Sequence, residues 1–165
     1  MRHCDRIALL LMAALFASSC NASSPPSDAA IDVDETTRLE IGTGFTAYET
    51  LPEDAPTLEI VHGPQGGYHV YLSMRVTGLV PASLLWRVVR QDDGRVLANL
   101  DLLARTGTFR PVDGALERVG DLVVIDVLSP ADVAMRDVRV EASATSSTGA
   151  MTTSVCVLRI VDDVP

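Results

Sequence analysis

The chain has 165 residues, of which 47% are hydrophobic and 21% charged, and its formal net charge is −9. This apolar fraction is enough for the core of one domain of ordinary size, and it excludes disorder along the whole chain. Nucleic-acid binding is excluded as well, because it needs clustered cations, whereas the basic residues are scattered arginines and the sequence contains no lysine.

Residues 1–19 have the order of a secretory signal peptide. A basic start is followed by an apolar run from residue 7 to residue 16, and small residues then precede Cys20. The apolar run is about half as long as the roughly 20 residues that a membrane-spanning helix needs. We therefore expect a leader that is cleaved rather than kept as a transmembrane anchor.

The end of this leader, Ala17-Ser18-Ser19-Cys20, resembles the lipobox of bacterial lipoproteins. Leucine usually stands three positions before the cysteine of that motif, where this chain has Ala17. The resemblance implies that Cys20 carries acyl chains such as palmitate and anchors the protein to a membrane of the cell envelope. Asn21 is not the aspartate that marks inner-membrane retention in enteric bacteria, which favours the outer membrane. Ordinary cleavage, leaving a soluble periplasmic or secreted protein, stays open.

Residues 20–37 are small, polar and acidic, and they show no apolar periodicity. A segment of this composition buries too little surface to fold. The sequence predicts a flexible linker here, between the lipidated Cys20 and a folded domain at residues 38–165.

From residue 38 onward, short β-type runs alternate with turn residues, without a helical period. This pattern predicts an all-β domain, an immunoglobulin-like β-sandwich of about seven to nine strands. The Asp93-Gly94 pair indicates a tight hairpin, and residues 57–145 read as a meander of hairpins. The expected strands are 38–42, 57–62, 68–77, 83–91, 95–103, 106–110, 121–127, 136–145 and 151–161.

Two residues refine the architecture. Trp86 stands in the middle of an expected strand, where an immunoglobulin-like sandwich places a core tryptophan. The paired cysteines of antibody domains are missing, so the prediction concerns the architecture and not that family. Alternation puts Cys156 on an inward face with Leu158, and we expect it to be a small buried hydrophobe with an inert thiol.

The stretch from His62 to His69, HGPQGGYH in one-letter code, is the most distinctive in the chain. One interpretation is a structural hairpin, in which glycines supply positive φ, Pro64 presets a turn and Gln65 hydrogen-bonds its own loop. A second is a copper or zinc site, in which His62 and His69 meet across the hairpin with Tyr48 or an acidic residue. Two histidines are too few for an ordinary zinc site, which needs three or four protein ligands.

A third interpretation is recognition of a protein or glycan partner. Loops and exposed aromatic side chains are where a rigid scaffold places its binding groups. The candidate binding residues are His62, Gln65, Tyr68, His69 and Tyr71.

Together with Leu39–Gly44 and Met74–Leu79, this stretch resembles a group of uncharacterised lipoproteins from myxobacteria and their relatives. Members share a strand, a Gly-Pro-Gln-Gly-Gly turn, a nearby histidine and a strand end of the form Arg-x-x-Gly-Leu. The resemblance covers roughly Leu39 to Leu79. It implies that this protein is also located in the cell envelope, and it implies no particular activity.

The sequence contains no Gly-x-Ser-x-Gly elbow, no phosphate-binding loop with lysine and no third histidine outside the leader. We therefore expect a non-enzymatic, lipid-anchored envelope protein whose immunoglobulin-like domain binds a partner or assists assembly, without a cofactor. The alternative is an envelope protein that binds copper or zinc through His62 and His69.

Overall fold

A computed structural model describes residues 37–105 and 107–162, and these residues belong to one compact unit. The expected signal peptide, Cys20 and nearly all of the expected linker lie outside the described residues. Within the described ranges, no helix is both long and apolar enough to cross a lipid bilayer.

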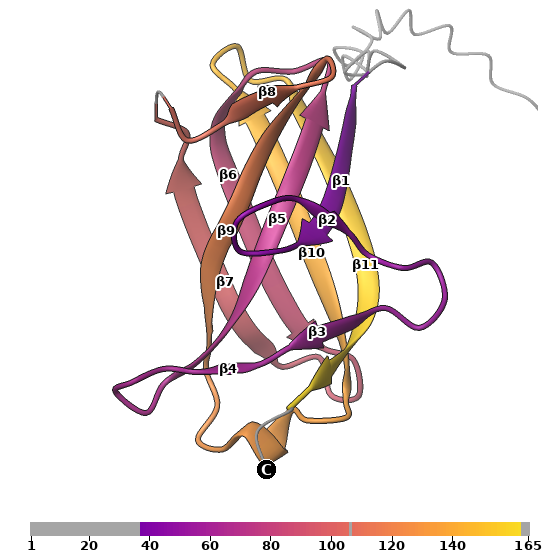
Figure 1. The fold of residues 1–165 in the computed structure, drawn as a ribbon, viewed down its shortest axis with the longest axis vertical. Helices are drawn as coiled ribbons and strands as arrows, with labels where there is room; N and C mark the ends of the chain where they lie inside the picture. The colour runs from indigo at the N-terminus through magenta and orange to yellow at the C-terminus, as the bar shows by residue number, and fades with distance from the viewer. Residues whose placement is uncertain (1–36, 106, 163–165) are drawn as a thin grey trace, which may run out of the picture. The chain divides into compact units, whose positions relative to one another are not determined.

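Two β-sheets face each other across one core (Figure 1). Sheet A has the strand order β2 (Glu49–Thr50), β1 (Arg38–Thr43), β5 (Tyr68–Thr77), β9 (Ala115–Ile125), β8 (Arg110–Val112), and β4 (Val61–His62) also pairs with β5. Sheet B has the order β3 (Thr57–Glu59), β11 (Met151–Val161), β10 (Asp137–Ser146), β6 (Pro81–Arg90), β7 (Val96–Leu103). A 3-10 turn, η1 (Pro130–Asp132), capped by Ser129, precedes β10.

The strand order is that of an immunoglobulin-like sandwich. Strands β1, β5, β9 and β8 form the A-B-E-D sheet, and β11, β10, β6 and β7 form the G-F-C-C′ sheet. The short β3 follows β1 in sequence but crosses to sheet B, where it pairs in parallel with β11. The predicted all-β sandwich is confirmed. The predicted meander is wrong, because the connections β5 to β6, β7 to β8 and β9 to β10 each pass from one sheet to the other.

Several strand boundaries differ from expectation. The expected strand at 57–62 divides at Ile60, which is 1% exposed where the chain leaves sheet B for sheet A. The expected strand at 106–110 is wrong, and β9 begins at Ala115 rather than at residue 121. Asp113 and Gly114 both have positive φ and form a hairpin turn between β8 and β9, the same Asp-Gly signal as at Gly94. The two-residue β2 was not expected.

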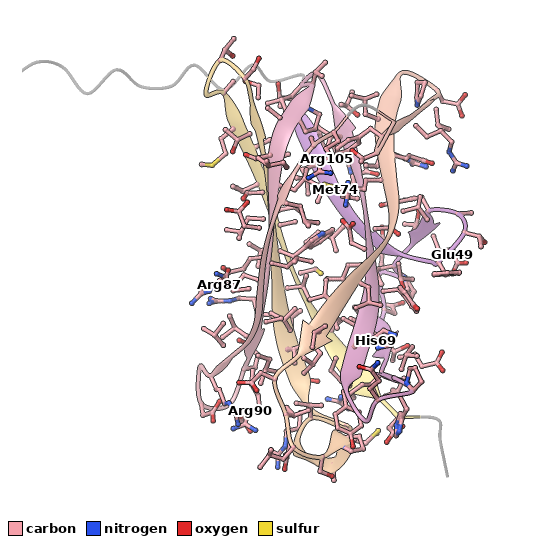
Figure 2. The ribbon with its side chains drawn as sticks, turned by 90° about the vertical axis from the view of Figure 1, so that its left-hand side faces the viewer. Glu49, His69, Met74, Arg87, Arg90 and Arg105 are labelled. Atoms are coloured by element: carbon pink, nitrogen blue, oxygen red, sulfur yellow. The ribbon has the colours of Figure 1, made fainter. Side chains whose placement is uncertain are left out.

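The core follows the alternation of the sequence. On β5, the inward side chains from Val70 to Val76 are at most 1% exposed, and Met74 lies between the two sheets (Figure 2). Trp86 on β6 is fully buried, as predicted. Its indole Nε1 donates a hydrogen bond of 2.8 Å to Asp121 Oδ2 on the opposite sheet, and Arg118 Nε donates to both oxygens of the same carboxylate. A polar bridge therefore links the sheets beside the core tryptophan.

Cys156 on β11 is partly buried and packs against the core. Burial raises the pKa of its thiol to about 11. The expectation of an inert structural thiol agrees with this environment, because the nucleophilic form of cysteine is the thiolate.

Candidate functional site

The turn that joins β4 to β5 is a tight hairpin. Gly63 N donates to Gly67 O at 2.7 Å, and Gly66 N donates to Gly63 O at 3.0 Å. Pro64 occupies the first central position, and Gly66 has a φ of 80° that a side chain would strain. The predicted structural hairpin is confirmed. The expected hydrogen bond from Gln65 to its own loop is not found, since this side chain is exposed and forms none among the described residues.

His62 ties the hairpin to the end of sheet B. Its Nε2 lies 2.9 Å from Asp162 Oδ1, and its ring contacts Tyr68 edge to face at a centroid distance of 5.2 Å. The register pairs His62 with Tyr68 across the β4–β5 ladder. Both side chains therefore lie on one side of the hairpin, and Tyr68 packs partly against the core.

His69 lies on the other side of the same hairpin. It pairs with Val61, and its ring meets Tyr71 edge to face at 5.2 Å. The residue is 9% exposed, and Nε2 is buried without a hydrogen-bond partner in the described part of the chain. Nδ1 faces Gly63, 3.8 Å from the position that a β-carbon there would occupy.

The two histidines do not converge, because directly opposed residues of an antiparallel pair share a face and His62 and His69 belong to neighbouring pairs. Tyr48, the third ligand considered, instead packs under Arg75, whose guanidinium lies 4.4 Å from its ring centre. Within residues 37–105 and 107–162, no group of three or more His, Cys, Asp or Glu side chains could hold a metal ion. The predicted convergence of His62 and His69 on copper or zinc is therefore wrong.

The outer side of sheet A carries a surface of exposed apolar side chains around His69, which we call the aromatic face. Tyr71 opposes Leu122 across the β5–β9 ladder, and His69 opposes Val124. Phe45, in the loop after β1, stacks on Tyr71 in a tilted arrangement at 4.8 Å. The exposed fraction is 66% for Phe45, 47% for Leu122 and 61% for Val124. The aromatic face consists of Phe45, Val61, His69, Tyr71, Leu122 and Val124.

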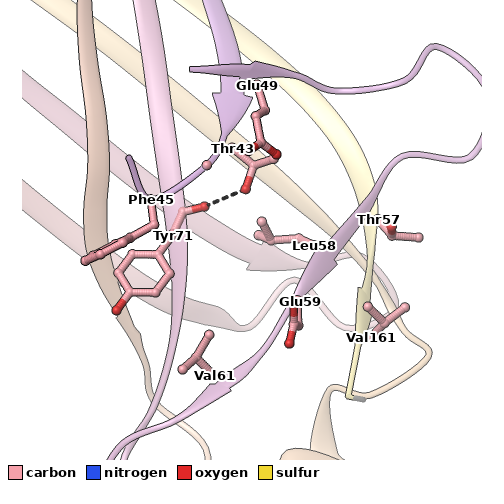
Figure 3. A pocket seen from close by; sticks show the side chains of 10 residues that line it. Thr43, Phe45, Glu49, Thr57, Leu58, Glu59, Val61, Tyr71 and Val161 are labelled. Carbon is pink, nitrogen blue, oxygen red and sulfur yellow. Dashed lines mark hydrogen bonds between the residues drawn. The ribbon is translucent and has the colours of Figure 1, made fainter. Parts of the chain in front are cut away.

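Two hollows border the aromatic face. The turn hollow, of about 300 Å³, is lined by Pro64, Gln65, Tyr68, His69, Leu122 and Val124, among others. The acidic hollow, of about 390 Å³, lies on the other side of Tyr71 and includes Phe45, Glu49 and Glu59 in its lining (Figure 3). Thr43 Oγ1 donates to Tyr71 O at 3.1 Å and holds the loop after β1 against β5.

The arginines of the described residues are almost all paired. Every described arginine other than Arg105 forms an ion pair with an aspartate or glutamate. Farther along the outer side of sheet A, Glu117 is 3% exposed and accepts from Arg75 at 2.7 Å and from Arg110 at 3.0 Å. Burial alone raises the pKa of Glu117, but the two guanidinium groups outweigh it and hold the pKa below its ordinary value.

Sequence reasoning found part of this surface. In the structure, His69 and Tyr71 lie together on the aromatic face, and Tyr68 and Gln65 line the turn hollow at its edge. His62 lies on the opposite side of the hairpin. It adds Phe45, Leu122 and Val124, which were not candidates. The alternation of Leu122 and Val124 with the buried Val123 in one strand is a signal that both sides of β9 are apolar.

No protein family model matches the sequence, and no curated protein matches it. Among the solved structures that match is that of murine CRIg, at 14% sequence identity and a TM-score of 0.35, with 77% of this chain and 99% of that chain covered. Similarity at this level carries no argument about function. The immunoglobulin-like arrangement rests on the strand order and register described above.

Proposed function

We propose that this protein is a lipid-anchored component of the cell envelope whose immunoglobulin-like domain binds a protein partner through the aromatic face, without catalysis. The observation that carries the proposal is the exposure of Phe45, Leu122 and Val124 around Tyr71 on one side of a sheet. Apolar and aromatic side chains gathered on one exposed face are typical of interaction sites, whereas isolated ones are ordinary.

A protein is favoured over a glycan by the chemistry of this surface. Val61, Leu122 and Val124 offer aliphatic area and no hydrogen-bonding groups for sugar hydroxyls. Aromatic side chains such as Phe45 and Tyr71 are enriched at the centres of protein interfaces. The formal net charge of −9 favours a partner with a basic surface, because opposite charge speeds encounter and rejects acidic competitors.

Site-specific photo-cross-linking in the producing cells tests the binding role. A photoreactive residue at Leu122 is expected to give an adduct with one defined protein, whose purified form then binds the isolated chain. Val155 is the matched control, because it is an exposed strand aliphatic of sheet B at 59% exposure. Equal yields of the same adducts from Leu122 and Val155 would contradict the proposal.

Membrane fractionation tests the anchor. Cys20→Ser is expected to prevent acylation and to move the protein from the membrane fraction to the soluble fraction. Cys156→Ser is the control and is expected to leave fractionation unchanged. Membrane association that survives Cys20→Ser would refute the lipid anchor.

A further inference from the structure

The imidazole of His69 is a buried polar group that the fold itself leaves unpaired. The residue is 9% exposed, and neither ring nitrogen forms a hydrogen bond or an ion pair within the described part of the chain. Tyr48 Oη and Arg139 Nε are also buried without a hydrogen-bond partner among the described residues, but neither residue lines the turn hollow or the acidic hollow. Buried polar groups are nearly always hydrogen-bonded, so an unpaired one in the wall of a hollow points to a partner from outside the chain.

The two ring nitrogens of His69 have different surroundings. Nε2 is buried, whereas Nδ1 faces Gly63, 3.8 Å from the position that a β-carbon there would occupy. Gly63, Gly67 and His69 all line the turn hollow, beside the hairpin turn at the start of β5 (Figure 2). An orphaned buried N–H is rarer in folded proteins than an orphaned buried acceptor, which favours the tautomer with its proton on Nδ1. The wall of the turn hollow then holds one hydrogen-bond donor.

The rest of the wall is mostly apolar. Pro64 belongs to the turn, and Leu122 and Val124 extend from β9 with large exposed fractions. The volume of about 300 Å³ is at the lower end of the range for ligand pockets, which suits a single side chain better than a larger ligand. An occupant that satisfies this wall combines an apolar body with one oxygen that accepts a hydrogen bond from Nδ1.

We infer that the turn hollow binds a tyrosine side chain of the partner protein, its ring packed against Leu122 and Val124 and its hydroxyl oxygen bonded to His69 Nδ1. Tyrosine is the side chain with an apolar ring and a terminal hydroxyl, and it is enriched in protein interfaces. This inference rests on the proposed binding function and supplies an anchor for it, because these three residues belong to both the turn hollow and the aromatic face.

Other side chains satisfy only part of this wall. Phenylalanine fills the apolar volume but leaves Nδ1 of His69 without an acceptor, and leucine does the same. Serine offers an oxygen without the apolar area that would cover Leu122 and Val124. A carboxylate offers an acceptor, but the formal net charge of −9 disfavours its approach.

Titration of the purified protein with acetyl-tyrosine amide, followed by NMR, tests the inference. We expect a Kd of about millimolar, as suits a single side chain. Acetyl-phenylalanine amide, which lacks only the hydroxyl, is expected to bind about fivefold more weakly, the value of one ordinary hydrogen bond. The ¹⁵N signal of His69 Nδ1 is expected to shift with the tyrosine compound and to stay in place with the phenylalanine compound. The ring nitrogens of His62 are the internal control, because they lie on the opposite side of the hairpin.

His69→Phe assigns the preference for tyrosine to the imidazole. The variant keeps an aromatic ring in the wall of the hollow and removes the donor, so the two compounds are expected to bind it equally. His62→Phe is the matched control, since it removes the other imidazole of the same hairpin, and the preference for tyrosine is expected to remain. If His69→Phe does not fold, the signal of Nδ1 in the parent protein decides the question alone.

Three results would overturn the inference. The first is equal binding of the tyrosine and phenylalanine compounds to the parent protein. The second is a preference for tyrosine that persists in a folded His69→Phe variant. The third is binding of acetyl-leucine amide as tight as that of the tyrosine compound, which would show that the hollow selects apolar area alone.

The outcomes separate this inference from the proposed function. If tyrosine is not preferred but Leu122 still cross-links to a defined partner, the tyrosine anchor is refuted and the aromatic face stands. If tyrosine binds as expected and Leu122 gives no specific adduct, the chemistry of the turn hollow stands and the larger interface is refuted.

Discussion

At the scale of single residues, Asp121 links the two sheets beside the core tryptophan. Its carboxylate is 7% exposed and accepts hydrogen bonds from Trp86 on the facing sheet and from Arg118 on its own strand. Antibody domains place a disulfide beside their core tryptophan, and this chain places a charged bridge there. A charged group is buried without a large cost only when it is paired and hydrogen-bonded. The burial of Trp86, Arg118 and Asp121 therefore depends on all three being present.

Removal of this carboxylate is expected to be costly. Asp121→Ala leaves Arg118 without its partner and the indole N–H unbonded, and we expect the free energy of unfolding to fall by about 3 kcal/mol. Urea unfolding followed by the fluorescence of Trp86, the only tryptophan, measures this. Asp101→Ala, an exposed change on β7, is expected to stay within about 0.5 kcal/mol of the parent. A loss under about 1 kcal/mol for Asp121→Ala would show that the bridge is dispensable.

Glu117 makes stability depend on pH. Its pKa in the folded protein lies below the ordinary value of 4.5, so the folded state binds this proton more weakly than the unfolded state does. The resulting stabilisation is present above pH 4.5 and is lost as the pH falls through the lowered pKa. The stability difference between the parent and Glu117→Gln is therefore expected to shrink on acidification. Unfolding curves at pH 7, 4 and 3 measure it, and a difference constant with pH would contradict the assignment.

At the scale of elements, the sequence predicted the long strands better than the connections. Alternation identified β5 and the side of it that faces the core, because one side packs on the opposite sheet. It could not reveal that Ile60 marks a change of sheet, since the apolar pattern continues through it while the hydrogen-bond partner changes from β11 to β5. Nor could it pair His62 with Asp162, because that contact joins residues 100 positions apart.

Gly120 shows how one glycine in β9 positions the loop of Phe45. Its N–H donates to Ser73 Oγ at 3.1 Å, its φ is 71°, and a β-carbon there would lie 2.7 Å from Phe45 O. Gly66 has a similar φ of 80° with nothing within 4 Å of the same position. Alanine substitutions at Gly66 and Gly120 therefore separate the stability cost of backbone strain from the cost of a steric clash.

We expect Gly66→Ala to lower the free energy of unfolding by about 1 kcal/mol, from backbone strain alone. Gly120→Ala is expected to cost about 2 kcal/mol more, because it also displaces the loop backbone. Urea unfolding measures both changes, and equal losses of unfolding free energy in the two variants would argue against the close approach of Gly120 to Phe45 O.

At the scale of the whole molecule, the reaction rate of the Cys156 thiol measures whether the sandwich stays folded around β11. Strand β11 pairs with β10 through nine residue pairs, and the thiol has a pKa of about 11. At pH 8 the fraction of thiolate is then about a hundredfold lower than for a thiol of ordinary pKa. Reaction with iodoacetamide, quantified by mass spectrometry of the peptide that contains Cys156, is expected to be slow in buffer and fast in urea. Rapid labelling of the folded protein would show that β11 opens locally.

The pairing of β1 with β5 has a mechanical consequence for a tethered protein. Arg38 lies opposite Thr77, and at roughly 3.3 Å per residue this is about 30 Å along β5 from Tyr68, next to the hairpin turn. If Cys20 is the anchor, tension from a partner held at Tyr71 reaches the membrane through the β1–β5 ladder. The pull runs along the strands and across their hydrogen bonds, so the five pairs from Arg38–Thr77 to Gly42–Ser73 carry the load together in shear rather than opening one after another.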